Sequence, residues 1–235
     1  MSNPIVEPRV IPSMVPPLEA GDHLTRDEFE RRYDATPGIK KAELIEGIVY
    51  MAPPVRFDFH GRPHFYLMTW LTRYASETSG VSGADNSSLR LDMKNEPQPD
   101  VFLFIDPGAG GLARLSEGYI DGAPELVAEV SGSTVSFDLN TKFRVYQRNG
   151  IREYLVWRVQ DREIDWFEMQ DGKYVRMVGD SDGVLRSNIF PGLWLASQAM
   201  IDLDTSKVLE VLQRGMATPE HAAFVSRLQS TRAKS

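Results

Sequence analysis

The sequence contains no cysteine, and this absence excludes several classes of protein. Disulfide scaffolds, thiol catalysis, iron–sulfur clusters and cysteine zinc sites all need that residue. Long hydrophobic runs are missing too: no run approaches the roughly 20 apolar residues of a membrane-spanning helix. The first 17 residues hold acids and prolines where a signal peptide would have an apolar core. We therefore expect a soluble protein, located in the cytoplasm.

Basic residues are scarce relative to acidic ones. The chain has 26 Lys and Arg against 33 Asp and Glu, so its formal net charge is −7. This is the wrong sign for a protein that coats nucleic acid, although one local basic patch could still bind it. The 235 residues are 42% hydrophobic and 25% charged, an ordinary globular composition and enough chain to bury a core.

Proline and apolar residues divide the chain into three parts. Residues 1–22 hold five of the fifteen prolines and predict an extended N-terminal arm. Residues 23–195 predict one α/β domain. Residues 196–235 predict a helical C-terminal extension, with helices at 207–214 and 219–230.

The spacing of hydrophobic residues in the central part is helical in some segments and strand-like in others, and it predicts the secondary structure. Thr25 and Glu28 match a capping box, and Asp171-Gly172 is typical of a hairpin turn. The expected elements, in order, are a helix to 34, two strands in 41–52 around Glu46-Gly47, a helix over 58–77 with Pro63 in its first turn, a loop over 80–86, strands at 88–93 and 101–105, a glycine-rich loop over 107–123, a strand at 126–130, a helix over 137–148, and strands at 151–158, 163–169 and 173–177.

Two of these strands are almost continuously apolar, and each carries or adjoins one acid. Strands of this kind are usually covered on both faces, as in a central sheet flanked by helices. Asp100 opens the first strand and Glu129 lies inside the second. A buried carboxylate is costly unless a cation or hydrogen bonds satisfy it, and Mg²⁺ prefers one or two carboxylates plus waters and substrate oxygens. The alternative is that Asp100 caps a turn and Glu129 forms an ion pair at a strand end.

The helix after Glu129 offers further polar groups. Asp138, Lys142 and Tyr146 are spaced by four and share one helix face. Lys142 could reach the same site, position an attacking water or deprotonate it, or stabilise negative charge. The alternative is a solvated face with an Asp138–Lys142 pair.

Other motifs are weaker. His60 and His64 have the spacing of a helical zinc site, but Gly61 stands where the HExxH motif requires Glu. The 107–123 loop has no GxGxxG or GK[ST] motif for phosphate binding.

Five segments, in order, resemble the Uma2 endonuclease family, a restriction-endonuclease-like branch of the PD-(D/E)XK nucleases. They are AELIEGIVYMAPP (42–54), His60 at the start of a helix, PQPDVFLFID (97–106), GAPELVAEVSGST (122–134) and DLNTKFRVYQRNGIREYLVW (138–157). The resemblance covers roughly residues 25–195. It implies a restriction-endonuclease-like fold, a central mixed β-sheet flanked by helices, and a Mg²⁺ site in which Mn²⁺ could substitute.

The resemblance also implies roles for particular residues. Asp100 matches the family's Asp in its QPD string, and Glu129 matches the Glu of its EVxS string. The wider superfamily has Lys two residues after that Glu, where this chain has Ser131, and the family pattern supplies the Lys from the next helix, as Lys142. Tyr146 follows one turn later and is expected to be a positioning group.

The acids of the first hairpin complete the expected site. Glu43 and Glu46 match the family's acidic positions there, and one of them would join Asp100 and Glu129 in the metal shell. Strand parity does not decide between them, and Glu46 is expected as the catalytic and metal-binding acid.

The resemblance implies a Mg²⁺-dependent endonuclease that hydrolyses DNA. Two alternatives remain: a catalytically silent binding or assembly protein on the nuclease scaffold, which the net charge favours, and a hydrolase of a smaller phosphodiester. The amphipathic terminal helix with Phe224 and Leu228 is expected to dock on its own domain or on a second subunit, and we expect a homodimer.

Overall fold

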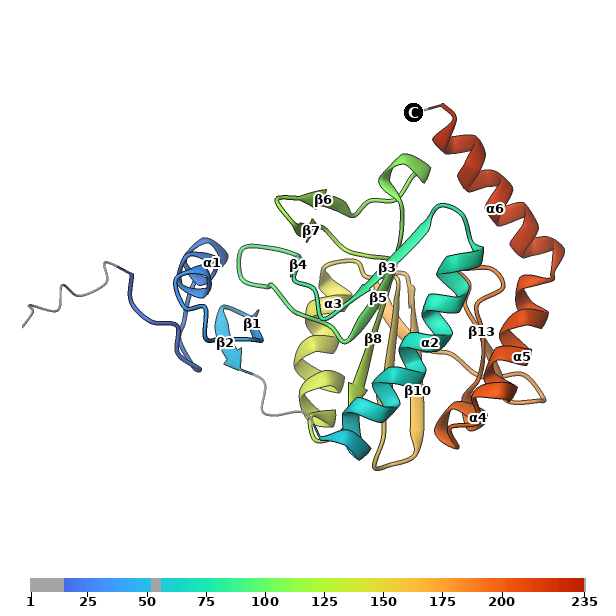
Figure 1. Cartoon of the computed structure of the whole chain (residues 1–235), viewed down its shortest axis with the longest axis horizontal. Coiled ribbons are helices and arrows are strands. Elements are labelled where there is room, and N and C mark those ends of the chain that lie inside the picture. The colour runs from blue at the N-terminus through green and yellow to red at the C-terminus, as the bar shows by residue number, and fades with distance from the viewer. Residues whose placement is uncertain (1–14, 52–55, 235) are drawn as a thin grey trace, which may run out of the picture.

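A mixed β-sheet forms the centre of the protein (Figure 1). The structure is a computed structural model and describes residues 15–51 and 56–234. The sheet has six strands in the order β11-β10-β9-β8-β5-β3, of which only β8 and β9 pair in parallel. Their bounds are β3 (Val81–Asp85), β5 (Val101–Ile105), β8 (Leu126–Ser131), β9 (Glu153–Arg158), β10 (Glu163–Gln170) and β11 (Lys173–Arg176). The expected mixed α/β architecture is confirmed.

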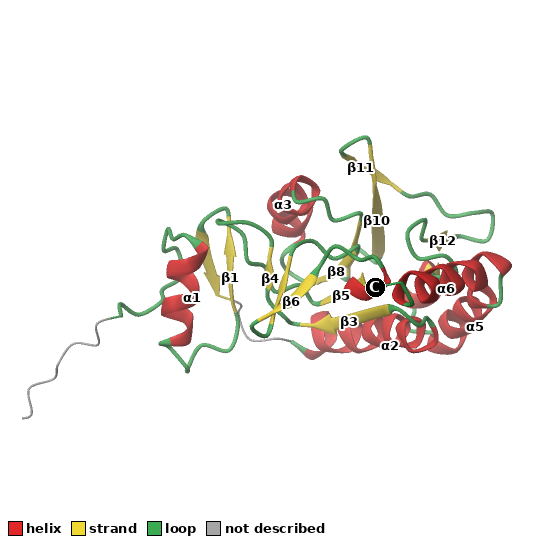
Figure 2. Cartoon of the chain, turned by 90° about the horizontal axis from the view of Figure 1, so that it is seen from above, coloured by secondary structure: helices red, strands yellow, loops and turns green. Residues whose placement is uncertain are grey.

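Helices cover both faces of this sheet, which explains why β5 and β8 are apolar throughout. Figure 2 shows α2 (Arg62–Glu77) on one side and α3 (Phe143–Arg148) on the other. Alternate side chains of a strand point to opposite faces. Val101 and Leu103 therefore pack in the cluster that includes α2, and Phe102 packs with Val127 in the cluster that includes α3.

Each of these helices begins with a wider π-helical turn. The turn η1 (Phe57–Gly61) precedes α2, and η3 (Phe137–Lys142) precedes α3. Pro63 lies in the first turn of α2, as predicted. A π-helix has slightly more than four residues per turn, so side chains four apart lie on nearly the same face. Asp138 and Lys142 are therefore both on the buried side of η3.

The C-terminal helices complete the core beside α2. The segment contains a hairpin and three helices: β12 (Val184–Arg186), β13 (Trp194–Ala196), α4 (Ser197–Ile201), α5 (Thr205–Met216) and α6 (Pro219–Arg232). Val208, Leu212, Phe224 and Leu228 are buried in the same cluster as the α2 side chains. The terminal helices thus dock on the chain's own sheet domain. Among the described residues, no helix combines the length and hydrophobicity needed to cross a membrane.

A small N-terminal unit packs around a separate hydrophobic cluster. It contains α1 (Arg26–Asp34), β1 (Ala42–Ile45) and β2 (Ile48–Met51). Thr25 occupies the expected N-cap of α1, but its side chain makes no capping bond. The expected partner in the capping box, Glu28, pairs with Arg31 and Arg32 instead. Most of the expected arm, residues 1–14, lies outside the described residues, and its described end is packed, since Leu18 is buried in this cluster.

Three regions differ from the sequence prediction. The expected 80–86 loop contains the edge strand β3, and the expected 88–93 strand is reduced to β4 (Leu89–Arg90). A Cβ at Gly83 would lie 2.7 Å from the Leu103 side chain and the Phe102 oxygen. The glycine suggests a loop in the sequence, but in the structure it permits β3 to pair closely with β5. The 107–123 loop contains η2 (Pro107–Ala109) and a hairpin, β6 (Arg114–Ser116) and β7 (Tyr119–Asp121).

Candidate active site

Asp100 and Glu129 lie side by side at the centre of the sheet. Val101 of β5 pairs with Ala128 of β8, and this antiparallel register sets Asp100 opposite Glu129. The Asp100 backbone N–H donates to Glu129 Oε2 at 3.3 Å, and the Val130 N–H donates to Asp100 Oδ2 at 2.8 Å. Both acids are only 4% exposed. Of the alternatives from the sequence, the ion pair of Glu129 is observed, with Lys142 Nζ at 2.9 Å, but inside β8 and not at a strand end. The side chain of Asp100 accepts a hydrogen bond from β8 and caps no turn.

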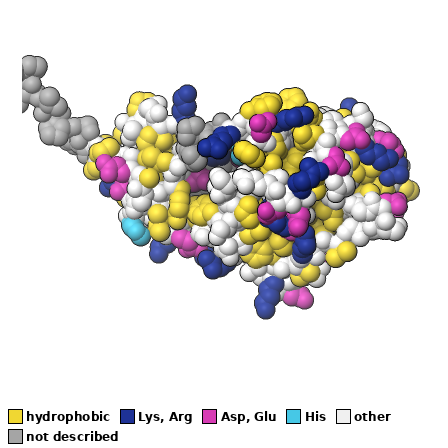
Figure 3. Space-filling model, turned by 90° about the horizontal axis from the view of Figure 1, so that it is seen from below, with side chains coloured by type: hydrophobic (Ala, Val, Ile, Leu, Met, Phe, Trp, Pro, Cys, Tyr) yellow, Lys and Arg dark blue, Asp and Glu magenta, His cyan; other side chains and the backbone are white. Residues whose placement is uncertain are grey.

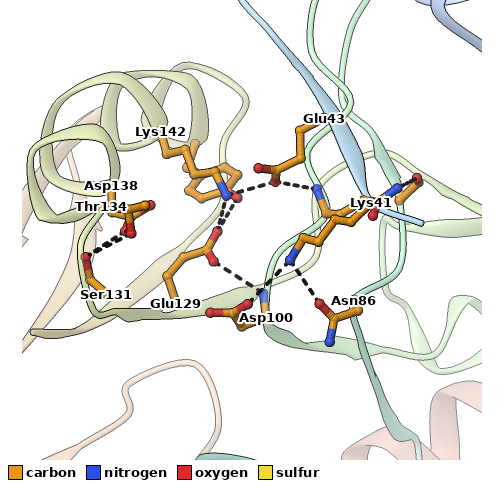
Figure 4. Close-up of polar contacts among 12 residues, drawn as sticks. Lys41, Glu43, Asn86, Asp100, Glu129, Ser131, Thr134, Asp138 and Lys142 are labelled. Atoms are coloured by element: carbon orange, nitrogen blue, oxygen red, sulfur yellow. Dashed lines mark hydrogen bonds and ion pairs between the residues drawn. The ribbon is translucent and has the colours of Figure 1, made fainter. Parts of the chain in front are cut away.

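Lys142 and Tyr146 reach Glu129 from the helix that covers this face. Glu129 has the same strand parity as Val127, so its side chain points toward η3 and α3. Lys142 Nζ donates to Glu129 Oε1 at 2.9 Å (Figure 4). The Tyr146 hydroxyl donates to the same oxygen at 2.8 Å. The structure thus brings together Asp100, Glu129, Lys142 and Tyr146.

Glu43, rather than Glu46, is the hairpin acid in this cluster. Glu43 Oε1 accepts hydrogen bonds from Lys142 Nζ at 2.8 Å and from the Gln98 backbone N–H at 2.7 Å. Glu46 occupies the β1–β2 turn with a φ of 54°, and its carboxylate pairs with Arg148 at 2.8 Å. The prediction that Glu46 completes a metal shell does not fit this geometry, because the turn directs its side chain out of the cluster.

A lysine and a histidine contact Asp100 from its more open side. His60 Nε2 lies 3.0 Å from Asp100 Oδ2, and Lys41 Nζ lies 3.5 Å from Asp100 Oδ1. Their side chains are 26% and 25% exposed, whereas those of Asp100, Glu129 and Lys142 are 5% exposed, so solvent approaches the cluster past Lys41 and His60. The sequence analysis did not predict Lys41 as a site residue. Its spacing of two from Glu43 could have indicated it, because residues two apart in a strand point to the same face.

The charges in the cluster depend on one another. Burial raises the pKa of Glu129, and Lys142 opposes this effect. Burial alone would lower the pKa of Lys142, but the carboxylates of Glu129 and Glu43 raise it well above its usual value. The same balance acts at Asp100, where burial raises the pKa but the hydrogen bond and charge of His60 bring it below its usual value. Lys142 is therefore an ammonium at neutral pH.

Tyr146 is a protonated phenol in this site. Burial and the neighbouring Glu129 raise its pKa well above 10, the ordinary value. The hydroxyl therefore donates its proton in the bond to Glu129 and does not provide a phenolate. This agrees with the expectation that Tyr146 positions another group.

Asp138 is buried but belongs to a neighbouring network. Its Oδ2 accepts hydrogen bonds from Ser131 Oγ at 2.8 Å and from Thr134 Oγ1 at 2.6 Å (Figure 4). These contacts close the loop between β8 and η3. The solvated helix face considered from the sequence is not observed, since both Asp138 and Lys142 are buried. Ser131, at the position of the superfamily lysine, supports this loop.

Gly132 allows η1 to approach the end of β8. A Cβ at Gly132 would lie 2.6 Å from the Phe59 backbone oxygen and 3.2 Å from Phe59 Cβ. Phe59 directly precedes His60, so this close contact sets the position from which His60 reaches Asp100.

Gly132→Ala is expected to displace η1 and lengthen the His60–Asp100 bond. That bond raises the pKa of His60 above 6.5, so the variant's His60 pKa should fall toward 6.5. NMR titration can follow the ring directly, since the chain has four histidines. Gly38→Ala is the matched control, because a Cβ there meets no atom within 4 Å. An unchanged His60 pKa in Gly132→Ala would contradict this account.

The donor set of the cluster fits magnesium better than zinc. Within the described ranges, no three His, Asp or Glu side chains are arranged to hold a metal ion. Two carboxylates suffice for Mg²⁺, which completes its octahedron with waters and substrate oxygens, whereas protein zinc sites use three or four protein ligands. The two histidines with zinc-site spacing have protein partners in place of a metal. His60 contacts the Asp100 carboxylate, and His64 contacts the Asp100 backbone oxygen.

Two carboxylate oxygens are available to such an ion. Asp100 Oδ1 and Glu129 Oε2 have the longest polar contacts in the cluster, 3.5 Å to Lys41 Nζ and 3.3 Å to the Asp100 N–H. Glu129 Oε1, by contrast, is held by Lys142 and Tyr146. The fixed oxygen orients the carboxylate, and the loosely held one can accept a cation.

Comparison with known proteins identifies a family and a similar fold among solved structures. No curated protein matches the chain. The chain is similar in structure to a crystal structure described as "a putative nuclease belonging to DUF820 from Anabaena variabilis", with a TM-score of 0.59 over 76% of this chain and 98% of that chain. The sequences are 14% identical, so this similarity shows the fold. The model of the Uma2 family, described as "Putative restriction endonuclease", matches residues 26–198. This match spans well over half of the chain and includes every residue of the cluster, and the protein is thus a member of the Uma2 family.

Proposed function

We propose that this protein is a Mg²⁺-dependent endonuclease that hydrolyses phosphodiester bonds of DNA. The observation that carries the proposal is the pair of buried carboxylates on adjacent strands, Asp100 and Glu129, with the Lys142 ammonium 2.9 Å from Glu129. The descriptions of the family and of the solved structure, a restriction endonuclease and a nuclease, support it. A buried acid pair is costly for stability, which favours a functional reason for it.

Asp100 and Glu129 would hold the ion, and Mn²⁺ could replace Mg²⁺. A bound divalent ion would polarise the scissile phosphate and lower the pKa of a water. The described residues supply the positioning: Val130 fixes one Asp100 oxygen, and Lys142 and Tyr146 fix one Glu129 oxygen. Glu46 has no part in this proposal, because Arg148 holds its carboxylate elsewhere.

Lys142 acts in this proposal as a permanent positive charge. Its raised pKa rules out a neutral amine that takes a proton from water at neutral pH. The ammonium instead limits the rise that burial causes in the pKa of Glu129, and it offsets negative charge that builds up on the phosphate. Glu43 holds the ammonium in place at 2.8 Å.

Lys41 and His60 are the groups on the side from which substrate would enter. Both contact Asp100 and both are partly exposed. When an ion neutralises Asp100, the Lys41 ammonium and the His60 ring N–H are free to donate to a phosphate oxygen. We assign them to phosphate binding at the entrance.

The silent scaffold protein remains the rival, favoured by the net charge of −7. Hydrolysis of a smaller phosphodiester is the third candidate, because a small substrate depends less on the global charge. The DNA endonuclease and the scaffold protein differ in whether they bind the ion. The DNA endonuclease and the hydrolase of a smaller phosphodiester differ in the size of the substrate.

The proposal is tested by ion binding and cleavage together. We expect calorimetry to detect one Mn²⁺ or Mg²⁺ site per chain, and we expect nicking or linearisation of plasmid DNA that stops when EDTA removes the ion. The same preparation should be offered a chromogenic phosphodiester. Absence of ion binding would support the scaffold protein, and cleavage of the small diester without cleavage of DNA would support the third candidate.

A further inference from the structure

Large aromatic side chains are exposed next to the candidate site. Phe57 is 69% exposed, Phe59 43% and Phe65 66%. All three belong to η1 and the first turn of α2, the same segment whose His60 and His64 contact Asp100. Burying three phenylalanines is worth several kcal/mol, so their exposure beside a site has a cost that a binding role explains.

The spacing of Phe57 and Phe65 places them on one face. They lie eight residues apart, about two helical turns, with Gly61 midway between them. A Cβ at Gly61 would meet only the Arg56 backbone oxygen, at 3.9 Å, so the surface over Gly61 is open. The result is a gap over Gly61, between the positions of the two phenylalanines on one side of the helix.

This gap continues into a groove on the surface of α2. The groove has a volume of about 680 Å³, and its lining includes Gly61, His64, Phe65, Met68 and Thr72. His64 also contacts the backbone of Asp100. The groove therefore begins beside the candidate site and runs along α2, with aromatic and aliphatic side chains near the site and hydroxyl groups further on.

The charge of this segment opposes that of the whole chain. Residues 56–73 contain three arginines against the single acid Asp58, whereas the whole chain has a net charge of −7. Arg56 and Arg62 are exposed beside the phenylalanines. Figure 3, seen from the side on which α2 begins in Figure 1, shows hydrophobic side chains on this face with charged side chains of both signs among them. A polyanion with apolar faces matches the phenylalanines and arginines of this segment.

We propose that Phe57 and Phe65, with Arg56 and Arg62, form a stacking surface for unpaired nucleobases. It would direct single-stranded DNA, or a single-stranded part of a duplex, from the α2 groove into the candidate site. The inference rests on the proposed nuclease function and specifies its substrate class. Bases stack on aromatic rings without regard to sequence, while the arginines contact the phosphates. In uniform duplex DNA the bases are already stacked on one another and cannot use these rings.

Binding to a silenced protein tests the inference separately from cleavage. The Glu129→Gln variant is titrated, in the presence of Ca²⁺, into a fluorescein-labelled 20-nucleotide strand and into the blunt duplex of the same sequence. Anisotropy should show tighter binding of the single strand. Phe57→Ala and Phe65→Ala in this background should each weaken single-strand binding about tenfold, since stacking contributes roughly 1–3 kcal/mol per base, and should change duplex binding less than about twofold.

Two further variants separate stacking from general hydrophobicity. Phe65→Trp should retain binding and Phe65→Leu should lose it. Leu115→Ala is the matched control, because Leu115 is 72% exposed on β6, away from η1, and its variant should bind as the parent does.

Three outcomes would overturn the inference. The first is unchanged single-strand binding by Phe57→Ala and Phe65→Ala, and the second is an equal loss of duplex binding. The third is conversion of a dimer to a monomer by these variants, measured by light scattering, which would make this face a contact between two copies of the chain. Plasmid and oligonucleotide cleavage by the unsilenced protein is scored independently: cleavage with no dependence on the phenylalanines rejects the stacking surface and leaves the nuclease function standing.

Discussion

Glu129→Gln is expected to reduce Mg²⁺-dependent cleavage at least about a thousandfold. Glutamine keeps the size of the side chain and can still bond with Lys142 and Tyr146, but it lacks the negative charge that holds a divalent ion. Ion-assisted polarisation of a phosphate is worth several kcal/mol, and each 1.36 kcal/mol is a factor of ten in rate. The measurement is the initial rate of plasmid cleavage at saturating Mg²⁺, together with calorimetric titration of the ion.

Glu125→Gln is the control for this substitution. Glu125 is a buried carboxylate just before the same strand, 5% exposed, and it accepts a hydrogen bond from the Ile105 N–H at 2.8 Å. It makes the same kind of contact outside the cluster, so its amide variant should cleave and bind Mg²⁺ as the wild type does. Equal rates for wild type and Glu129→Gln, or equal losses in both variants, would remove Glu129 from the ion site.

Lys142→Met is expected to lower the free energy of unfolding by about 3–5 kcal/mol at pH 8. Its ammonium lies 2.8 Å from Glu43 and 2.9 Å from Glu129, and all three groups are buried. Removal of one member of a buried ion pair leaves the other charge without compensation, at a cost of this size. Urea unfolding of the purified variant measures the change.

The loss should shrink as the pH falls. Burial already raises the pKa of Glu129, and removal of the ammonium takes away the charge that opposes this rise. The folded variant then keeps a proton on Glu129 at a pH where the unfolded chain has released it, so its stability decreases as the pH rises and is greatest near pH 5.

A second substitution and a surface lysine serve as controls for Lys142. Adding Glu129→Gln to Lys142→Met should recover part of the stability at pH 8, because one of the uncompensated carboxylates is removed. Lys207→Met should cost less than about 0.5 kcal/mol, since Lys207 pairs with Glu210 on an exposed face of α5. A destabilisation of Lys142→Met that is independent of pH and unaffected by Glu129→Gln would show that lost packing, and not charge, is responsible.

The sequence predicted the centre of the sheet and the acids on it, because both follow from strong local patterns. Continuous apolar runs identified β5 and β8, and an acid inside such a run is conspicuous. Spacing by four placed Lys142 and Tyr146 on the face that covers Glu129. The order of five motifs along the chain identified the family, which its model confirms over residues 26–198.

The residues from the N-terminal hairpin could not be settled in the same way. A turn at Glu46-Gly47 breaks the alternation of a strand, so parity alone did not distinguish Glu43 from Glu46. Strand β1 lies beside the segment that leads into β5, because Leu44 and Glu96 exchange both backbone hydrogen bonds. This is a tertiary contact, and local sequence patterns do not predict it. This pairing brings Glu43 to Lys142 and Lys41 to Asp100.

The edge strand β3 was missed for a related reason. Gly83 and its small neighbours are typical of a loop, and only the neighbouring β5 shows that a glycine is needed there for close packing. The hairpin β6–β7 likewise depends on pairing between short segments that have no hydrophobic period of their own.

The separate packing of the N-terminal unit has a consequence for how the protein loses activity. Glu43 and Lys41 come from or adjoin a hairpin that packs mainly in a cluster of the N-terminal unit and joins the cluster of the sheet through Ile45 and Tyr50. Asp100, Glu129 and Lys142 belong to the sheet domain. Undocking of the hairpin would disassemble the candidate site while the sheet and its helices stay intact. Inactivation and global denaturation are then two events with two midpoints, and a spectroscopic melting curve of the sheet alone would overestimate the temperature at which the protein still works.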